Sequence, residues 1–356
     1  MPLQRLQLNN FRLFQDSIFS LSSGTNLILG ENGSGKTSIL ESISILLSGS
    51  SFRTKETKEC ISHNRDFYKI TATGVLQNKK LQLSIENGVN SRLKSSRRLG
   101  ENSARKEELY FLQIVMAKNL RMIDGEPDIR REYFNQLMFH VKPGTKKLHT
   151  LYQKALKQRN RCLKNNLSKS ELSTWSKELA DLGLELSLEQ YSFFQTFKEQ
   201  NIKYIEEIVG TGEFTFLDKL NITFSKGWER SKKLIESLEE SIEKDKAIGY
   251  TSKGPHRMDI TFQINNKKAS SNLSRGQLKI LILLIFLSNS SLIQELTQAE
   301  TLLMIDDLSS ELDTNNLSSL LSRIVQSENQ IVLTGIQGEE MHKSIEKLTN
   351  FTQINL

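Results

Sequence analysis

The feature that most constrains this chain is the octapeptide Gly30–Thr37, which reads GENGSGKT. It fits the pattern G-x-x-x-x-G-K-[ST] in full. The apolar segment Thr25–Leu29 precedes it, and residues 36–47 carry apolar side chains at helical spacing, so the loop is predicted to join a buried strand to a helix. Glycines let the backbone turn so that successive N–H groups point inward, and the helix adds the positive end of its dipole. The octapeptide therefore predicts a phosphate-binding loop in which Lys36 reaches the β- and γ-phosphates.

Every member of this loop is a candidate nucleotide contact. The hydroxyl of Thr37 is also a candidate metal ligand, because Mg²⁺ prefers hard oxygen ligands and keeps phosphate oxygens among them. The motif therefore predicts ATP and Mg²⁺ as cofactors. The candidate contacts are Gly30, Glu31, Asn32, Gly33, Ser34, Gly35, Lys36 and Thr37.

A second motif supplies the acidic partner that a metal-bound nucleotide needs. Residues 302–307 read LLMIDD, an apolar strand that ends in two carboxylates. In parallel sheets the carboxyl ends of the strands face the ligand, so Asp306 is predicted to hold Mg²⁺ directly or through water. Asp307 is the predicted catalytic group that orients or deprotonates the attacking water.

Two further short motifs narrow the class of P-loop protein. Residues 273–277 read LSRGQ at the start of an apolar helix, and residues 310–313 read SELD just after the acidic pair. In this order and spacing they resemble the signature motif and the D-loop of ABC-type ATPases. The resemblance implies that the signature motif of one subunit binds the γ-phosphate held by the other, so that two identical copies complete each site. The implied contacts are Ser274, Gly276, Gln277 and Asp313.

Positive charge is clustered along the chain. Lys and Arg number 48 against 41 Asp and Glu, a net charge of +7. Residues 141–170 are rich in Lys and Arg and contain no acidic residue. Clustered positive charge favours a polyanion such as DNA, although a solvated face also produces such clusters. A second cluster comprises Arg92, Lys94, Arg97, Arg98, Arg105 and Lys106.

Composition argues against several other classes. Hydrophobic residues make up 37% and charged residues 25%, the balance of a soluble globular protein. The two cysteines, Cys60 and Cys162, lie far apart and in no CxxC, so neither a disulfide framework nor a metal site is expected. No apolar run reaches the roughly 18 residues that cross a bilayer, and Leu281–Leu287 is predicted to be part of a buried helix. No signal peptide is recognisable, and we expect a cytoplasmic protein without membrane association.

The order of predicted elements indicates two domains. Strands and one helix dominate the first part, whereas residues from about 128 to 208 are rich in Leu, Lys, Glu and Gln and predict an antiparallel helix pair or small bundle. The predicted fold class is α/β: an ABC-type, SMC-head-like P-loop ATPase domain with a compact helical insertion domain. We place the discontinuous ATPase domain at residues 1–125 and 240–356, and the helical lobe at residues 126–239.

Several short segments, spread almost end to end, resemble one family. They are, in chain order, Asn10–Arg12 (NFR), Ser51–Thr54 (SFRT), Gly125–Pro127 with Arg130–Arg131, Lys157–Asn160 (KQRN) and Gly254–Asp259 (GPHRMD). With the motifs above they resemble the RecF family of bacterial recombination mediators, within the SMC-like ATPase heads.

This resemblance implies an ATP-dependent DNA-binding protein of DNA replication, repair and recombination. Mg-ATP is then expected to drive homodimerisation on duplex DNA near single-strand gaps or duplex junctions, and slow hydrolysis to release it. RecR and RecO are the expected partners, in RecA loading and the SOS response. Enzymatic activity is expected to be a weak, DNA-stimulated ATPase that serves as a switch.

The resemblance also assigns roles to individual residues. Gln113 falls where the Q-loop, which senses the γ-phosphate and the metal, is expected. The switch histidine of ABC ATPases is expected after the predicted strand Ile331–Leu333, where Thr334 stands. Together with the short side chain of Asp307, in place of a glutamate, this predicts slow hydrolysis.

The basic part of the helical lobe is the candidate DNA contact, with a solvated helix face as the alternative. Arg12 and Arg53 either lie near nucleotide or DNA or form structural ion pairs. The candidate DNA contacts are Lys154, Lys157, Arg159 and Arg161.

Two other functions remain open at the level of sequence. One is an SMC-like ATPase head that serves a nuclease or a defence system through protein contacts, which the KQRN and GPHR segments disfavour. The other is a P-loop small-molecule kinase, which the LSRGQ motif disfavours.

Overall fold

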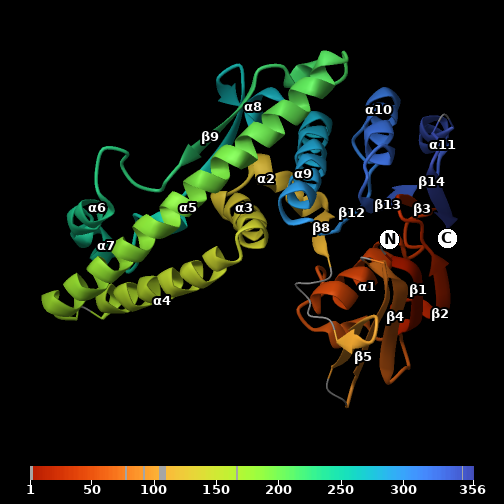
Figure 1. Cartoon of the computed structure of the whole chain (residues 1–356), viewed down its shortest axis with the longest axis horizontal. Helices are drawn as coiled ribbons and strands as arrows, with labels where there is room; N and C mark the ends of the chain where they lie inside the picture. Colours follow the sequence, from red (N-terminus) through yellow and green to blue (C-terminus); the bar gives the residue numbers. More distant parts are fainter. Residues whose placement is uncertain (1–2, 77, 91–92, 104–109, 166, 347) are drawn as a thin grey trace. The chain divides into compact units, whose positions relative to one another are not determined.

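The computed structural model describes residues 3–76, 78–90, 93–103, 110–165, 167–346 and 348–356. The chain divides into two compact units, both drawn in Figure 1. We call them the sheet unit, Met1–Lys118 with Leu283–Leu356, and the helical unit, Asn119–Ile282.

The boundary between the units differs from the predicted one after the helical insertion. Residues 240–282 were assigned to the ATPase domain, but the structure groups them with the helical unit. The reason is a strand pairing that composition and periodicity do not show: β10 (Asp259–Ile264) forms an antiparallel ladder with β9 (Leu220–Ser225). A small antiparallel sheet therefore lies inside the helical unit.

A five-stranded parallel sheet forms the centre of the sheet unit, in the order β14-β3-β13-β12-β8. Its inner strands are continuous apolar runs because both faces of a parallel sheet are covered. Since all five strands run in one direction, β3 and β12 end at the same edge, on either side of β13. The bounds are β3 Thr25–Gly30, β8 Phe111–Val115, β12 Thr301–Ile305, β13 Gln330–Ile336 and β14 Phe351–Asn355.

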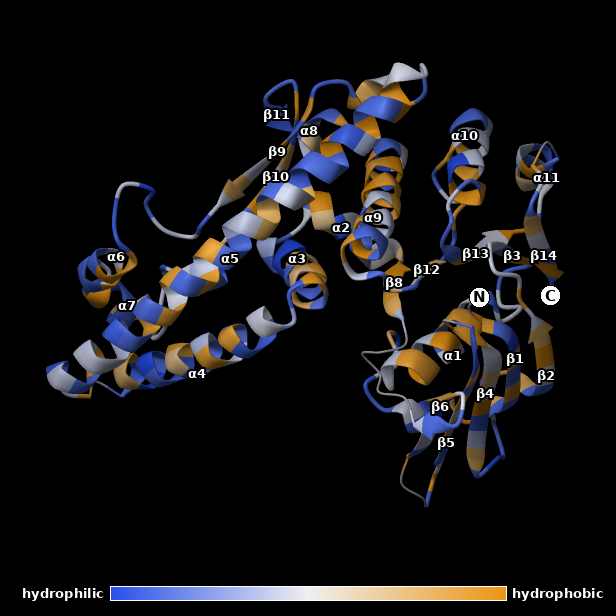
Figure 2. Cartoon of the chain, viewed as in Figure 1, coloured by the Kyte–Doolittle hydropathy of each residue, from blue (hydrophilic) through white to orange (hydrophobic). Residues whose placement is uncertain are grey.

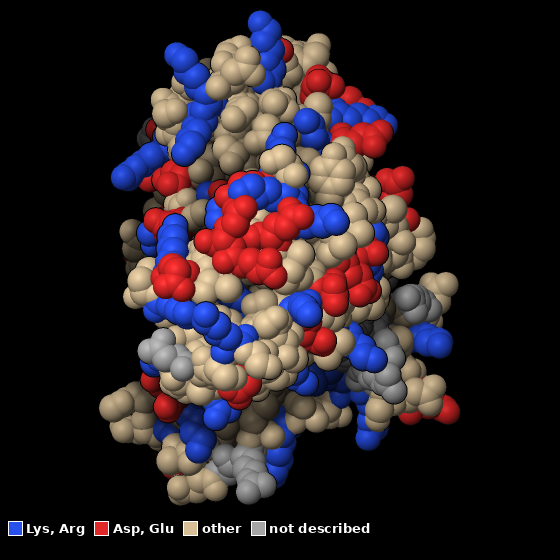
Figure 3. Space-filling model, turned by 90° about the vertical axis from the view of Figure 1, so that its left-hand side faces the viewer, with Lys and Arg blue, Asp and Glu red and all other residues tan. Residues whose placement is uncertain are grey.

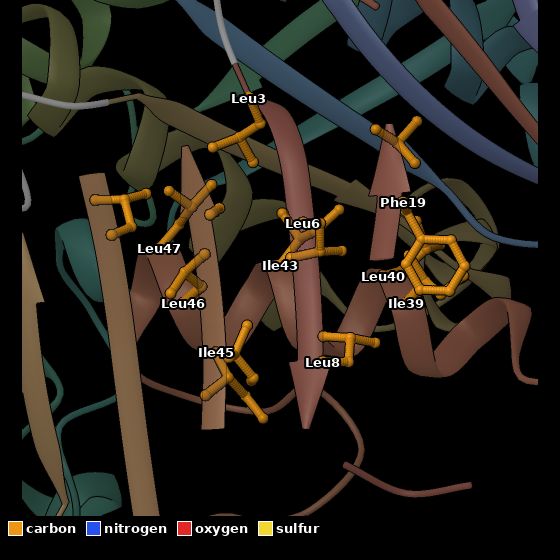
Figure 4. Packing of buried hydrophobic residues seen from close by; sticks show 14 of the residues in the cluster. Leu3, Leu6, Leu8, Phe19, Ile39, Leu40, Ile43, Ile45, Leu46 and Leu47 are labelled. Atoms are coloured by element: carbon orange, nitrogen blue, oxygen red, sulfur yellow. The ribbon is translucent and has the colours of Figure 1, made fainter. Parts of the chain in front are cut away.

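The second sheet of this unit is antiparallel and six-stranded, in the order β2-β1-β4-β5-β6-β7. Apolar and polar residues alternate along its strands, so one face is buried. Leu6 and Leu8 of β1 and Phe19 of β2 pack with Ile39 and Ile43 of α1, the helix after the P-loop (Figure 4). The bounds are β1 Leu3–Phe11, β2 Phe14–Ser20, β4 Phe67–Leu76, β5 Lys79–Gly88, β6 Lys94–Leu99, β7 Asn102–Ser103 and α1 Lys36–Ser48.

Two long helices dominate the helical unit. α4 (Gly144–Lys164) and α5 (Lys169–Gly210) pack as an antiparallel pair, as predicted (Figure 1). Ser168 and Glu171 form a capping box that starts α5, and the 42 residues of α5 span about 63 Å at 1.5 Å per residue. Figure 2 shows apolar residues recurring along both helices between polar ones.

Shorter elements complete the two units. In the helical unit they are α2 Ala117–Asp124, which begins in the sheet unit, α3 Pro127–Val141, α6 Leu234–Glu240, α7 Ile242–Ile248, β11 Lys267–Lys268 and α8 Ala269–Asn272. In the sheet unit they are α10 Thr314–Val325 and α11 Glu339–Ile345.

Gly183 lets three segments approach the middle of α5. A Cβ there would lie 2.6 Å from Leu234 Cδ2, 3.1 Å from Tyr152 Cε2 and 3.4 Å from Pro255 Cδ. A glycine in a helix interior costs about 1 kcal/mol relative to alanine, and this packing explains its presence.

The apolar helix α9 (Arg275–Thr297) begins in the helical unit and ends in the sheet unit. Among the described residues it is the one helix long and apolar enough to cross a membrane, and 72% of its most apolar stretch is buried inside the protein. Leu281–Leu287 is almost wholly buried, which confirms the prediction of a buried helix.

Candidate nucleotide site and its relatives

Backbone geometry explains the glycines of the phosphate loop. Gly33 and Gly35 have φ values of 86° and 104°, a region that only glycine adopts freely. A Cβ at Gly35 would also lie 2.7 Å from Phe14 Cζ, so a larger residue is excluded on two grounds. The loop follows β3 directly and passes into α1, which confirms the predicted strand–loop–helix context.

Two polar side chains of the loop fit a phosphate ligand. Lys36 Nζ donates to the carbonyl oxygens of Gly30 at 2.8 Å and Glu31 at 2.7 Å, so its ammonium lies across the loop. Ser34 Oγ is buried without a hydrogen-bond partner in the described part of the chain. Buried hydroxyls are normally satisfied, so an orphaned one inside a phosphate loop fits a missing phosphate oxygen.

Thr37 and Asp306 meet at the edge of the parallel sheet, as predicted. Thr37 Oγ1 lies 3.0 Å from each carboxylate oxygen of Asp306. A hydroxyl facing a carboxylate at the end of a phosphate loop suits Mg²⁺, which takes oxygen ligands. The described residues contain no cluster of three or more His, Cys, Asp or Glu, so a metal here would take its remaining ligands from phosphate and water.

Thr334 has a different role from the one expected at the switch position. β13 does not end at Leu333 but continues to Ile336, and Thr334 is completely buried inside it. Its hydroxyl donates to Asp306 Oδ1 at 2.8 Å and accepts from the backbone N–H of Asp307 at 2.8 Å. Thr334 in β13 therefore holds Asp306 and the backbone of Asp307 in position through these two hydrogen bonds.

Because β13 ends at Ile336, the position expected for the switch histidine lies further along the chain than Thr334. Ile336 lies in register with Gly30, and the backbone N–H of Gln337 points to Gly30 O at 3.4 Å. The residue that follows β13 is therefore Gln337, and residues 330–338 contain no histidine.

Asp307 adopts a left-handed conformation with φ 55°, which Asp tolerates better than most residues, and its side chain is exposed. It lies directly after Asp306 at the sheet edge, where a group acting on water belongs.

The prediction for Gln113 is wrong. Gln113 is 3% exposed in the middle of β8, opposite Leu303 of β12, whereas Asp306 follows the end of β12. The distance of three residues along a strand is about 10 Å. Its amide Nε2 donates to Ser290 Oγ of α9 at 2.8 Å, so Gln113 ties β8 to α9 and does not lie with Thr37 and Asp306 as predicted.

The signature motif starts α9. Ser274 Oγ accepts from Gln277 N at 3.3 Å, and Gln277 Oε1 accepts from Ser274 N at 2.9 Å, a reciprocal capping box. Ser274 is exposed and Gly276 partly exposed, so the positive end of the α9 dipole faces outward. The motif belongs to the helical unit, whereas the phosphate loop belongs to the sheet unit.

Asp313 of the predicted D-loop caps α10. Its carboxylate accepts from Asn316 N at 2.9 Å and Asn316 Nδ2 at 2.6 Å. The backbone hydrogen bond from Asn316 lowers the pKa of Asp313 below its usual value. The side chain is exposed, and its part in a subunit interface stays a prediction.

The NFR and SFRT segments meet on Glu41 of α1, a residue that sequence reasoning missed. Arg12 donates to both oxygens of Glu41 at 2.9 and 2.7 Å, and Ser51 Oγ and Arg53 Nη1 donate at 2.6 and 3.3 Å. Burial alone would raise the pKa of Glu41, but the hydrogen bonds from Arg12 and Ser51 hold it below its usual value. Of the two alternatives for Arg12 and Arg53, the structure shows the structural ion pair.

The KQRN segment and the basic residues next to it on α4 divide into exposed and buried side chains. Lys154, Lys157 and Arg161 are exposed on α4. Arg159 is completely buried, and its Nη1 donates to Asp245 Oδ2 at 2.9 Å. The prediction that Arg159 contacts DNA is therefore wrong.

Asn160 is structural as well. Its side-chain oxygen accepts from the N–H and the hydroxyl of Thr251 at 2.8 and 2.7 Å. Half of the KQRN segment thus connects α4 to the chain around residues 245–251.

The remaining family segments also pair with one another. Arg130 binds both carboxylate oxygens of Asp259 at 2.7 and 3.0 Å, and Arg131 donates to the carbonyl of Met258 at 2.8 Å. His256 lies 2.6 Å from the hydroxyl of Tyr152, and burial lowers the pKa of His256 to about 4. The GPHR segment therefore binds α3 and α4 to the stretch that leads into α9.

Fold and site together define a class. A phosphate loop and an acidic strand end flank β13 in a parallel sheet, and the same unit holds an antiparallel sheet. The chain also carries a helical insertion whose last part leads into a signature-like helix start. This is the architecture of an ABC-type P-loop ATPase head of the SMC kind. The chain belongs to the RecF/RecN/SMC N terminal domain family, whose model matches residues 2–355, and within it to RecF.

Sequence relatives cover almost the whole chain. The DNA replication and repair protein RecF of Pseudoalteromonas translucida is 30% identical over 99% of this chain and 97% of that protein. RecF of Hahella chejuensis is 33% identical over 96% of this chain and 92% of that protein.

Solved structures show the same fold. The recombination mediator protein RecF with ATPrS, of the RecFOR pathway, matches with a TM-score of 0.75 at 23% identity, over 95% of this chain and 93% of the other. An Smc head bound to the C-terminal winged-helix domain of ScpA matches with a TM-score of 0.56 at 15% identity, over 96% and 92%.

Proposed function

We propose that this protein is an ATP-dependent DNA-binding protein of replication, repair and recombination, in which Mg-ATP joins two copies on duplex DNA. The observation that carries the proposal is the Lys36, Thr37 and Asp306 constellation, together with an exposed signature motif elsewhere in the chain. ATP is the nucleotide present in solved RecF structures of similar fold.

The phosphate loop supplies the contacts to ATP. The backbone N–H groups between Gly30 and Thr37 face the phosphates, Lys36 turns from the loop carbonyls to the β- and γ-phosphates, and Ser34 Oγ gains its partner. Thr37 and Asp306 are the residues that would hold Mg²⁺. Mg²⁺ supplies charge neutralisation at the phosphates.

Each site is completed by the second copy. Ser274 Oγ accepts from Gln277 N in the capping box and keeps its own proton free, so it and the N–H groups at the start of α9 can donate to the γ-phosphate held by the partner's loop. Such a contact lasts only while the γ-phosphate is attached, so binding closes the dimer and hydrolysis releases it. A two-fold dimer of this kind uses the same surface of both copies.

Hydrolysis is slow in this proposal, because the groups that would act on water are few. Asp307 has a shorter side chain than glutamate, and the hydroxyl of Thr334 is already bonded to Asp306. The enzyme is thus a weak ATPase, stimulated by DNA, whose turnover times release.

The basic face of α4 is the proposed DNA contact of the helical unit. Lys147, Lys154 and Arg161 recur at two-turn intervals, so they lie on one side of the helix over about 21 Å. Lys157 and Lys164 repeat the spacing one turn away and are also exposed. Figure 3 shows the side of the molecule where α4, α6 and α7 appear in Figure 1, with both signs of charge on it. The positive charge proposed to attract DNA to the helical unit is therefore that of the exposed side of α4.

The partners follow from the family. Solved relatives are named as mediators of the RecFOR pathway, and on that ground we expect RecR and RecO to bind this protein near single-strand gaps, in RecA loading and the SOS response.

The test is to measure mass in solution and affinity for duplex DNA at fixed salt, without nucleotide and with ADP, ATP or a non-hydrolysable analogue. ATP and the analogue should each produce dimers and raise the affinity for DNA. Lys36→Ala and Ser274→Arg should remain monomeric, whereas Asp307→Asn should dimerise and persist. A monomer that binds duplex DNA equally tightly with and without ATP would refute the proposal.

A further inference from the structure

The outer face of the six-stranded sheet is mostly polar. Strand register places its outward side chains in rows that cross the sheet. One row runs Ser20, Arg5, Thr73, Gln82, Arg98 and Ser103. The next two run Ile18, Gln7, Thr71, Ser84 and Ser96, and then Asp16, Asn9, Lys69, Glu86 and Lys94.

This face is exposed and positively charged. Arg5, Lys80, Lys94 and Arg98 are exposed, and Lys69 is partly exposed. Arg97, the neighbour of Arg98 in the sequence, points to the other face, where its Nη2 approaches Leu46 O at 3.5 Å. Alternation along β6 thus divides Lys94, Arg97 and Arg98 between two faces, whereas Arg92, Arg105 and Lys106 of the predicted basic cluster lie outside the described residues.

Two carboxylates interrupt the positive charge, both in the outermost row. Asp16 already accepts from Asn9 Nδ2 at 2.8 Å and Gln7 Nε2 at 3.4 Å, and Glu86 faces Lys69 and Lys94 in the strand register. The outward apolar side chains of the described strands, Ile18, Phe67 and Val75, lie toward its margins. The face therefore has the composition of a phosphate-binding surface rather than of a protein interface, in which apolar residues occupy the centre.

We propose that this outer sheet face binds the phosphate backbone of duplex DNA. Arg5, Lys94 and Arg98 make the charged contacts, and the Ser, Thr and Gln side chains between them add hydrogen bonds to phosphate oxygens. Six strands at about 4.8 Å spacing give a face about 24 Å wide, broad enough for a duplex to lie along it. Single strands are usually held by aromatic stacking, and among the described residues of this face only Phe67, at the margin, offers a ring.

This inference rests on the proposed DNA binding and adds a second surface, in the other unit of the chain. The variant to test is the triple substitution Arg5→Gln, Lys94→Gln and Arg98→Gln in the full-length protein. Its matched control is Lys177→Gln, Lys203→Gln and Lys244→Gln, which removes the same charge from exposed positions of the helical unit. Affinity for a labelled duplex is measured with the non-hydrolysable ATP analogue over a range of salt concentrations.

The sheet variant should bind duplex at least tenfold more weakly than the wild type. Its slope of log affinity against log salt should fall by about 2.7, or 0.9 for each lost phosphate contact. The control should keep the wild-type affinity and slope. Thermal unfolding and analogue-driven dimerisation should match the wild type in both variants, which separates this surface from the nucleotide site.

Wild-type affinity and slope in the sheet variant would overturn the inference and leave the proposed function intact. A wild type that fails to bind duplex at all would overturn both. Weakened binding to a single strand or to anionic vesicles, with unchanged duplex affinity, would assign the face to another ligand and equally reject it. If the triple variant unfolds, the single variants Arg5→Gln and Arg98→Gln, each at an exposed position, are measured instead. Each should lower the slope of log affinity against log salt by about 0.9, and an unchanged slope in both would overturn the inference.

Discussion

The hydroxyl of Thr334 serves two neighbours at once at the sheet edge. It donates to Asp306 and accepts from the N–H of Asp307, and it is completely buried. One small side chain thus sets the positions of the metal ligand and of the group that acts on water.

Replacing Thr334 by valine keeps the shape but removes both hydrogen bonds. We expect a loss of about 1–3 kcal/mol in the free energy of unfolding, because the N–H of Asp307 loses its acceptor in a buried place. ATP turnover should fall as well, while nucleotide binding through Lys36 persists. Urea unfolding and steady-state ATPase assays measure the two effects. Thr334→Ser, which keeps the hydroxyl, should restore both, and a valine variant with normal turnover would contradict the assigned role.

Arg159 and Arg161 are two residues apart but should respond in opposite ways to substitution. Arg159→Met leaves Asp245 buried without its charged partner, which costs about 3–5 kcal/mol of stability. Arg161→Gln removes an exposed charge and should leave the unfolding free energy almost unchanged while weakening DNA binding. Chemical unfolding and DNA titration of both variants provide the comparison. Equal stability of the two would contradict the burial seen for Arg159.

These residues also show where prediction from the sequence ends. The phosphate loop and Asp306 were predictable because each motif carries its own backbone requirement. Arg159 and Gln113 were not, because a motif shows residue type and spacing but not which side of an element meets another part of the chain. Glu41 was not predictable either, since it lies on the side of the predicted helix opposite to Ile39 and Ile43, where an exposed charge is expected.

At the scale of elements, the start of α9 has two uses. Its capping box stabilises the helix, and the same atoms are the proposed contacts to the partner's γ-phosphate. The strands, the P-loop helix and the helix pair of the insertion were predictable from periodicity. β9 was placed in the helical lobe but β10 was not, because their pairing joins segments far apart in the sequence.

Ser274→Asp separates the two uses of this helix start. Aspartate is as good an N-cap as serine, so the free energy of unfolding should stay within about 0.5 kcal/mol. Its negative charge repels a γ-phosphate, and ATP-driven dimerisation should therefore be lost. Light scattering with and without ATP tests the second effect. If the aspartate variant dimerised normally, the start of α9 would not be a phosphate contact.

The GPHR turn should make stability depend on pH. Burial lowers the pKa of His256 to about 4, against 6.5 for an unperturbed histidine, so between these values the unfolded chain binds a proton that the folded chain does not. The free energy of unfolding should therefore fall as pH drops from 6.5 to 4, by up to about 3 kcal/mol from this residue.

Urea unfolding of the wild type and of His256→Gln at several pH values isolates that contribution, because other groups titrate equally in both. The glutamine variant should show a flatter dependence over this window. Parallel curves would mean that His256 does not stay neutral in the folded protein.

For the whole molecule, the division into two units has a functional meaning. The phosphate loop belongs to one unit and the signature motif to the other. A site built from the loop of one copy and the signature of its partner needs both motifs in a dimer, but not both intact in the same chain.

Mixing two inactive variants tests this central claim most directly. Lys36→Ala lacks a working loop and Ser274→Arg lacks a working signature, so neither forms a complete site with itself. In a mixed dimer the loop of the Ser274→Arg copy meets the signature of the Lys36→Ala copy, and one complete site returns. Differently tagged copies with the non-hydrolysable ATP analogue should therefore form mixed dimers that neither variant forms alone, detected by co-purification and mass in solution. If mixing restores nothing while the wild type dimerises, the two motifs act within one copy, and the shared-site account is wrong.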